Sequence, residues 1–143
     1  MKAAGVEPGF VSGGPKLLLR LEGAALMAAA LFYYAQAGGD WGRFALLFLA
    51  PDLSLFAYLG GPGPGAIVYN AAHTTMGPLA YGALGAATGE ALLVQIAAIH
   101  LAHIGFDRLL GFGLKYGVSF AATHLGPVGR GPLEARAFKT RIL

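Results

Sequence analysis

Apolar residues gather in four long runs along the chain, separated by short stretches rich in glycine. Each run is close to the ~20 residues that an α-helix needs to cross the hydrocarbon core of a bilayer. Gly38-Gly39-Asp40, the segment 60–65 and Thr88-Gly89 carry the residues that end helices and form turns. The pattern therefore predicts four transmembrane helices, at Leu17–Gln36, Arg43–Leu59, Ala66–Ala87 and Ala91–Leu110.

Two of these predicted helices contain a proline: Pro51 lies in the middle of the second, and Pro78 lies inside the third. Proline weakens a helix in water, but inside a membrane bundle neighbouring side chains and water satisfy the carbonyls that it frees. Glycine and alanine are abundant in all four runs, and small residues let membrane helices approach closely. We therefore expect an all-α membrane protein built as a four-helix bundle.

The composition supports a membrane protein and excludes several functions. The chain is 56% hydrophobic and 12% charged, whereas soluble domains carry roughly 25% charged residues. The chain has no cysteine, which excludes disulfides, thiolate catalysis and cysteine metal ligands. We see no basic groove interleaved with aromatic residues, so nucleic acid is not an expected partner and the lipid bilayer is.

The ends of the chain carry most of its positive charge. We expect a flexible lead at residues 1–16, a transmembrane domain with an interfacial Gly-rich segment at 17–126, and a basic tail at 127–143. Ala35-Gln36-Ala37 resembles a signal-peptidase site, but Arg20 and Glu22 within the preceding run favour a retained helix. By the positive-inside rule, both termini are expected in the cytoplasm; the charges concerned are Lys2, Lys16, Arg20, Arg108, Lys115, Arg130, Arg136, Lys139 and Arg141.

Ionisable groups inside these apolar runs are the candidate functional residues, because each costs roughly 2.5–3.5 kcal/mol at the centre of a membrane helix. In the fourth helix, His100, His103 and Asp107 fall within about 60° of one another around the helix axis. The third helix carries Asn70, His73, Thr74 and Tyr81, the second carries Asp52 and Ser54, and the first carries Glu22.

Depth in the membrane suggests that some of these groups meet. If both termini are cytoplasmic, Asp52, His73, His103 and Glu22 lie at the same depth to within about one helical turn. Four groups at one depth on four helices are expected to converge in the cytoplasmic half of the bundle.

Imidazoles combined with carboxylates suit zinc, manganese or iron. A metal at this depth would act on an ester near the lipid headgroups, and His124 would reach it from the segment after the fourth helix. Other interpretations stay open. In a purely structural interpretation, Asp107 and Arg108 form a helix-end pair, and His100 and Asn70 make hydrogen bonds between helices. In a haem interpretation, haem b binds between His73 and a histidine of the fourth helix. In a third interpretation, the cluster conducts ions or protons.

Several motifs resemble a small bacterial integral-membrane family, domain-of-unknown-function family 4260. They are Ala50-Pro51-Asp52-Leu53-Ser54, Tyr69-Asn70-x-x-His73-Thr74, the long run from His100 through Asp107-Arg108 to Lys115-Tyr116, and Thr123-His124-Leu125-Gly126. The resemblance covers about Leu17–Gly126. It implies a membrane protein and no particular activity. We expect the protein in the bacterial inner membrane.

A shorter similarity links the chain to SOS-regulated membrane-bound metal-dependent hydrolases. Pro51-Asp52, His73-Thr74 and His103-x-x-x-Asp107 resemble the Pro-Asp, Thr-His-Ser and His-x-x-x-Asp elements of those enzymes. Their His-Arg pair is missing here, and Val68-Tyr69 stands near its place. The similarity implies a metal-ligand set consisting of Asp52, His73, His103 and Asp107.

The sequence thus predicts a metal-dependent hydrolase that acts on a lipid-like ester. In this interpretation His100 or His124 is the general base, and Arg108 and Lys115 hold an anionic substrate. The alternative is a non-enzymatic bundle: an ion, proton or small-ligand carrier, a haem binder, or a subunit of a larger membrane complex.

Overall fold

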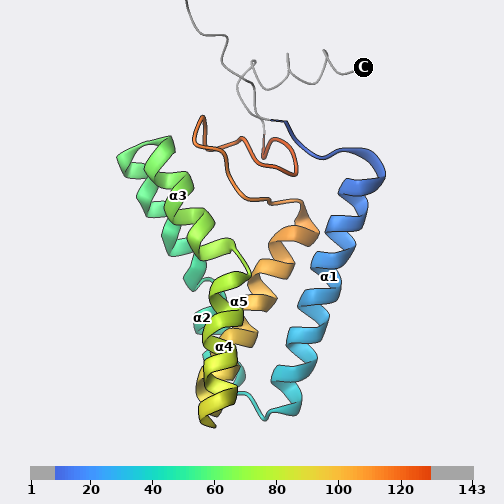
Figure 1. Cartoon of the computed structure of the whole chain (residues 1–143), viewed down its shortest axis with the longest axis vertical. Coiled ribbons are helices and arrows are strands. Elements are labelled where there is room, and N and C mark those ends of the chain that lie inside the picture. The colour runs from blue at the N-terminus through green and yellow to red at the C-terminus, as the bar shows by residue number, and fades with distance from the viewer. Residues whose placement is uncertain (1–8, 130–143) are drawn as a thin grey trace, which may run out of the picture.

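The structure is a computed structural model that describes residues 9–129, and this part of the chain is helical up to Leu110 (Figure 1). No strand is present among the described residues, where Lys115 and Thr123 form an isolated antiparallel bridge. The elements are α1 (Gly13–Gln36), α2 (Trp41–Phe48), the 3₁₀ helix η1 (Ala50–Gly60), α3 (Pro62–His73), α4 (Met76–Thr88) and α5 (Ala91–Leu110).

Three helical segments are long and apolar enough to cross a membrane: Gly13–Gln36, Trp41–Gly60 and Ala91–Leu110. Large apolar side chains cover their outer faces, as Phe32 (68% exposed), Leu46 (77%) and Leu59 (90%) illustrate. Isolated exposed apolar residues are common on soluble proteins, but a helix face that consists of exposed apolar residues is not. The natural surroundings of these helices are therefore the hydrocarbon of a bilayer.

The fourth predicted helix agrees with α5 at both ends, whereas the first begins earlier than predicted. Residues 13–16, which we assigned to a flexible lead, form the first turn of α1. Residues 1–8 of that lead and residues 130–143 of the predicted basic tail lie outside the described residues.

The second predicted helix changes type at its proline, which the sequence pattern did not indicate. A regular helix would bring the ring of Pro51 against the carbonyl of Leu47, and the ring nitrogen has no hydrogen to donate. The α-helix accordingly ends at Phe48, and the chain continues as a 3₁₀ helix from Ala50 to Gly60. A 3₁₀ segment of this length is uncommon.

The third predicted helix is two helices, so the continuous helix expected at Ala66–Ala87 was wrong. Pro78 would clash with the carbonyl of Thr74 in a continuous helix. Thr74 instead takes an extended conformation (φ −83°, ψ 144°), and α4 begins at Met76. Pro78 then lies in the first turn of α4, where a backbone N–H has no partner within the helix.

α5 is the central helix, with α1 along one side and α4 along another (Figure 1). α1 and α5 approach most closely at Gly23 and Gly105. A Cβ on Gly23 would lie 2.8 Å from the carbonyl oxygen of Gly105, and a Cβ on Gly105 would lie 2.6 Å from the oxygen of Gly23. Only glycine at both positions allows this contact.

Residues 111–129 form an irregular segment that lies across one end of the helices, beside the start of α1 (Figure 1). It is tied to the N-terminal stretch, because the backbone N–H of Val11 donates to the carbonyl of His124 (2.8 Å). It is tied to α3 through Asn70, whose side-chain amide makes two hydrogen bonds to the backbone of Lys115, at 2.7 and 2.8 Å. Both ends of the described chain therefore lie at the same end of the bundle.

Candidate metal site

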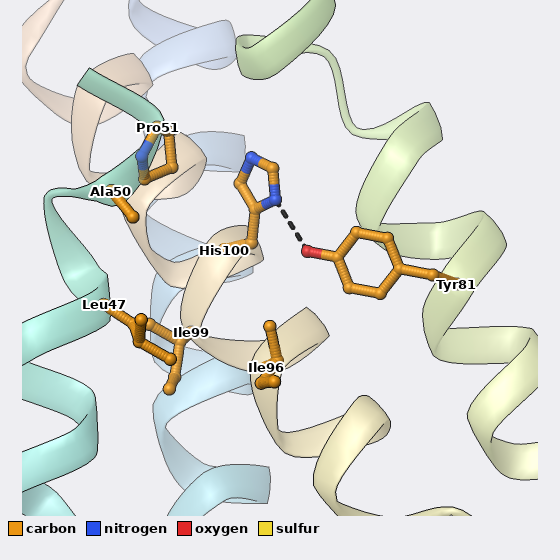
Figure 2. A pocket seen from close by; sticks show the side chains of 7 residues that line it. All are labelled: Leu47, Ala50, Pro51, Tyr81, Ile96, Ile99 and His100. Atoms are coloured by element: carbon orange, nitrogen blue, oxygen red, sulfur yellow. Dashed lines mark hydrogen bonds between the residues drawn. The ribbon is translucent and has the colours of Figure 1, made fainter. Parts of the chain in front are cut away.

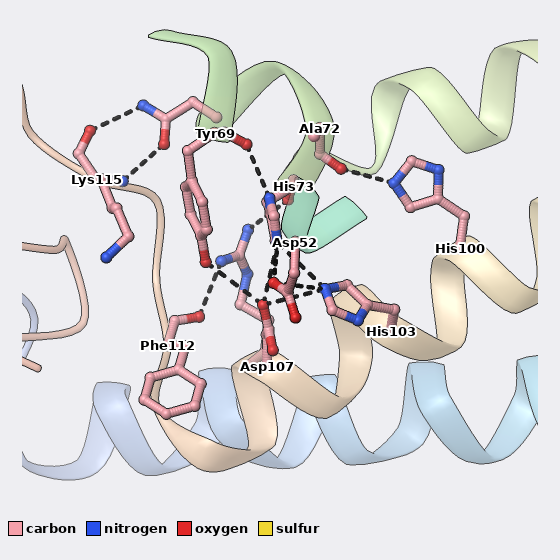
Figure 3. Close-up of polar contacts among 11 residues, drawn as sticks. Asp52, Tyr69, Ala72, His73, His100, His103, Asp107, Phe112 and Lys115 are labelled. Atoms are coloured by element: carbon pink, nitrogen blue, oxygen red, sulfur yellow. Dashed lines mark hydrogen bonds and ion pairs between the residues drawn. The ribbon is translucent and has the colours of Figure 1, made fainter. Parts of the chain in front are cut away.

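Asp52, His73, His103 and Asp107 meet between η1, α3 and α5 (Figure 3). Each offers one ligand atom, and the four atoms lie within 4.8 Å of one another. The two imidazoles are almost fully buried, with side chains 1% exposed, and the carboxylates of Asp107 and Asp52 are 10% and 39% exposed. Asp52, His73 and His103 therefore converge as their depth suggested, and Asp107 lies with them.

The two imidazole nitrogens lie at nearly equal distances from each other and from the two carboxylate oxygens. Nε2 of His73 lies 3.2 Å from Nε2 of His103, 3.3 Å from Oδ1 of Asp52 and 3.5 Å from Oδ2 of Asp107. Nε2 of His103 lies 3.5 Å from each of the same two oxygens. Four ligands at ~2.0–2.1 Å from a tetrahedral metal are separated by roughly 3.3–3.4 Å. The five distances that involve an imidazole nitrogen match this value, and the two carboxylate oxygens lie within 4.8 Å of each other.

Direct ion pairing explains these distances less well. Charge-assisted hydrogen bonds between an imidazolium and a carboxylate are usually ~2.7–2.9 Å long. All four nitrogen–oxygen distances in this cluster are 3.3–3.5 Å. In addition, a single hydrogen on Nε2 of either histidine would have to be shared among three neighbours. One ion between the four atoms would account for all of these distances.

The tautomer of His73 is set by its backbone neighbour. Its Nδ1 donates to the carbonyl of Tyr69 (2.9 Å), which leaves the lone pair of Nε2 directed into the cluster. Histidine ligands of metals are commonly oriented in this way. Nδ1 of His103 is buried without a hydrogen bond of good geometry, although the carbonyl of Phe48 interacts with this ring.

Tyr69 supports the cluster and was missed in the sequence analysis as a functional residue. Its ring stacks on the imidazole of His73, with centroids 3.7 Å apart and an interplanar angle of 12°. Its hydroxyl donates to Oδ2 of Asp107 (3.4 Å). The signal was present in the sequence, because residues four apart on a helix lie on the same face.

The helix break between α3 and α4 builds part of the site. Ending α3 at His73 leaves its last carbonyls without partners in the helix. Side chains of α5 satisfy two of them: Nε2 of His100 donates to the carbonyl of Ala72 (2.6 Å), and Arg108 donates to that of His73 (3.2 Å). The proline-induced break is thereby fastened to the helix that carries His103 and Asp107.

His100, a candidate general base, lies outside the cluster. Because a carbonyl only accepts, its bond to Ala72 requires a hydrogen on Nε2, and Nδ1 therefore accepts from the hydroxyl of Tyr81 (2.7 Å). Both ring nitrogens are thus engaged. In this position His100 joins α5 to α3 and α4.

Lys115 and Arg108 lie next to the site, and both already have partners. The ammonium of Lys115 donates to the carbonyl of Phe120 (2.8 Å) and lies 3.9 Å from the ring centre of Phe120 and 5.0 Å from that of Tyr69. Burial lowers the pKa of Lys115, and the negative charge of Asp107 opposes that effect. Arg108 donates to the carbonyl of Phe112 (3.2 Å) as well as to that of His73.

His124 lies in the segment across the end of the helices. Its Nδ1 accepts a hydrogen bond from the backbone N–H of Leu114 (2.8 Å). Burial lowers the pKa of His124, and the nearby charge of Arg108 lowers it further. His124 is therefore neutral near pH 7 and is not one of the four converging residues.

Glu22 is an exposed residue of α1 and does not join the cluster, although its depth suggested that it would. Equal depth does not ensure convergence, because a residue must also face inward. α1 contributes instead by packing on α5 through Gly23.

The helices and the buried Asp/His cluster together define a helical integral-membrane protein with a candidate metal site. Residues 16–128 match a family described as a domain of unknown function (DUF4260), and the chain belongs to this family. The match confirms the more extensive of the two resemblances. No curated protein and no solved structure matches the chain significantly.

Proposed function

We propose that Asp52, His73, His103 and Asp107 bind one divalent metal ion, with zinc, manganese and iron as the candidates. The observation that carries this proposal is the convergence of four ligand atoms within 4.8 Å, with the five separations that involve an imidazole nitrogen at 3.2–3.5 Å. Charge supports it as well: two carboxylates neutralise a divalent ion when the imidazoles are neutral. A neutral assembly is the form that a low-dielectric membrane interior tolerates best.

The activity we propose is hydrolysis of a lipid-like ester. A divalent ion supplies Lewis-acid chemistry and activated water. The partly exposed carboxylate of Asp52 marks the side on which a substrate would approach. Arg108 and Lys115 provide positive charge for an anionic group beside it. Of the two candidate bases we favour His124, because both ring nitrogens of His100 are committed to protein partners.

A structural metal in a non-enzymatic bundle is the second candidate. Four protein ligands are typical of structural zinc sites, whereas catalytic sites usually keep one position open. Haem is a poorer candidate, because the Nε2 atoms of His73 and His103 are too close together for a porphyrin plane to pass between them.

Metal analysis of detergent-purified protein tests the site. We expect about one equivalent of zinc, manganese or iron per chain, and loss of at least nine-tenths of it in the double variant Asp52→Asn/His103→Gln. Glu22→Gln is the matched control that should retain the metal, because this exposed residue of α1 contributes no ligand atom. A folded wild-type protein that neither contains nor takes up any of these ions would refute the proposal.

The same preparations separate the two functions. If the protein is a hydrolase, the loaded wild type cleaves acyl esters in mixed micelles, and the double variant does not. If the metal is structural, no ester is cleaved, while metal removal still lowers the temperature of unfolding.

We propose that the chain crosses the bacterial inner membrane four times, with α3 and α4 forming the third, broken crossing and with both ends cytoplasmic. Broken backbone at membrane depth is tolerated where protein surrounds it. Because the chain has no cysteine, a single cysteine can report the topology. In intact cells we expect Ser119→Cys to be protected from a membrane-impermeant maleimide and Glu90→Cys, at an exposed position of the loop between α4 and α5, to be labelled. The reverse pattern would contradict this orientation.

A further inference from the structure

A second feature of the bundle is a cavity of about 250 Å³, open on one side, that is lined by residues of α2, η1, α4 and α5 (Figure 2). Its wall is apolar except for one hydrogen-bonded pair, Tyr81 and His100. The lining residues are Leu47, Ala50, Pro51, Tyr81, Ile96, Ile99 and His100. Because Tyr81 and His100 satisfy each other, an apolar ligand could occupy the cavity without leaving a buried polar group unpaired.

Two elements carry residues of both the cavity and the metal site. On α5, Ile96 and His103 are seven residues apart and share a helix face, about 10 Å from each other along the axis. On the neighbouring segment, Pro51 lines the cavity and the next residue, Asp52, belongs to the metal cluster. The two elements therefore place the cavity close to the metal site.

The two sites also lie at different depths. The cavity-lining residues of α5 lie in the middle of that helix, whereas His103 and Asp107 lie toward its C-terminal end. A lipid has the same arrangement, with a polar ester near the interface and a hydrocarbon chain directed toward the bilayer centre.

We propose that this cavity binds the hydrocarbon segment next to the ester of a single-chain acyl lipid. The inference rests on the proposed function and specifies its substrate class. An apolar cavity of roughly 150 Å³ already takes up benzene, so about 250 Å³ accommodates several methylene groups but not a whole lipid chain. The remainder of a longer chain extends into the surrounding bilayer.

Filling the cavity from its exposed side tests the proposal. Ala50 lines the cavity and is exposed, so Ala50→Phe introduces a ring there without disturbing buried residues. Ala45→Phe is the matched control, because Ala45 is an exposed alanine of α2 that does not line the cavity. The probe is a decyl alcohol with a diazirine near the middle of its chain, photolysed in detergent with and without excess unlabelled decanol.

We expect wild type and Ala45→Phe to be labelled on peptides containing residues 47–51 and 96–100, with decanol reducing that labelling at least fivefold. Ala50→Phe should reduce the competed labelling about tenfold. Labelling that decanol does not reduce, or that Ala50→Phe leaves unchanged, overturns the proposal.

Metal content, measured on the same samples, separates the two proposals. Competed labelling in a protein that binds no metal would leave the cavity as an apolar binding site and refute the hydrolase. A full equivalent of metal without competed labelling would refute the cavity proposal alone.

Discussion

Asp107→Asn is expected to change the stability of the protein in opposite directions with and without bound metal. In the loaded protein the substitution removes a ligand, and we expect metal affinity to fall more than ~100-fold, because the loss of even an outer-shell partner commonly costs 10–100-fold. At saturating metal for the wild type, this loss corresponds to about 2.7 kcal/mol of stability.

Without metal, the same substitution should stabilise the protein by about 1 kcal/mol. Two carboxylates then face the same pair of imidazoles, and like charges repel at this distance. An asparagine at this position removes one charge and offers an N–H that a neutral imidazole can accept. Neutral imidazoles are expected at pH 8, well above the usual histidine pKa of about 6.5.

The measurement is thermal unfolding in detergent at pH 8, with saturating zinc and again after chelation. Glu22→Gln removes an exposed carboxylate of a neighbouring helix and should shift neither curve. If the cluster is only an ion-paired contact between helices, Asp107→Asn destabilises the protein by the same amount in both conditions. The sign of the stability change caused by Asp107→Asn without metal therefore distinguishes a metal site from a polar contact that only joins helices.

The face and the bounds of α5 could be predicted from the sequence because both follow from helix geometry alone. His103 and Asp107 are one turn apart. Gly89 caps the C-terminus of α4 and Gly111 caps that of α5, both in the left-handed conformation. Depth then placed Asp52 and His73 beside them. This step succeeded because transmembrane helices are nearly parallel, so sequence distance from a helix end approximates distance along the membrane normal.

The interruptions of the helices could not be located from the sequence pattern. A proline within an apolar run is compatible with a kink, a change to a 3₁₀ helix or a complete break, depending on which neighbours satisfy the freed carbonyls. At Pro78 the outcome is a break, because His100 and Arg108 of α5 accommodate the carbonyls of Ala72 and His73. These partners are distant in sequence, so no local pattern reveals them.

The role of the C-terminal segment also depends on contacts that are distant in sequence. Its glycines indicated only that it is not a helix. The hydrogen bonds of Asn70 to Lys115 and of Val11 to His124 then decide where it lies. Glu22 shows where the depth argument fails, because Glu22 lies at a suitable depth but on the outward face of α1. Depth selects candidates, and the packing of helices decides among them.

Gly23→Ala is expected to destabilise the protein by about 2–3 kcal/mol, because it adds a methyl group where α1 and α5 are in backbone contact. The new Cβ would lie 2.8 Å from the carbonyl oxygen of Gly105 and 2.9 Å from the backbone nitrogen of Leu109, and neither atom can rotate away. Moving α1 outward disturbs the helix that carries His103 and Asp107, so metal affinity should fall together with stability.

Gly77→Ala is the matched control: it adds the same methyl group within α4, where the new Cβ would meet no neighbouring atom within 4 Å, and should leave both quantities unchanged. Thermal unfolding and zinc titration of the two variants test the prediction, and equal behaviour of the variants would show that the close contact between α1 and α5 does not support the site.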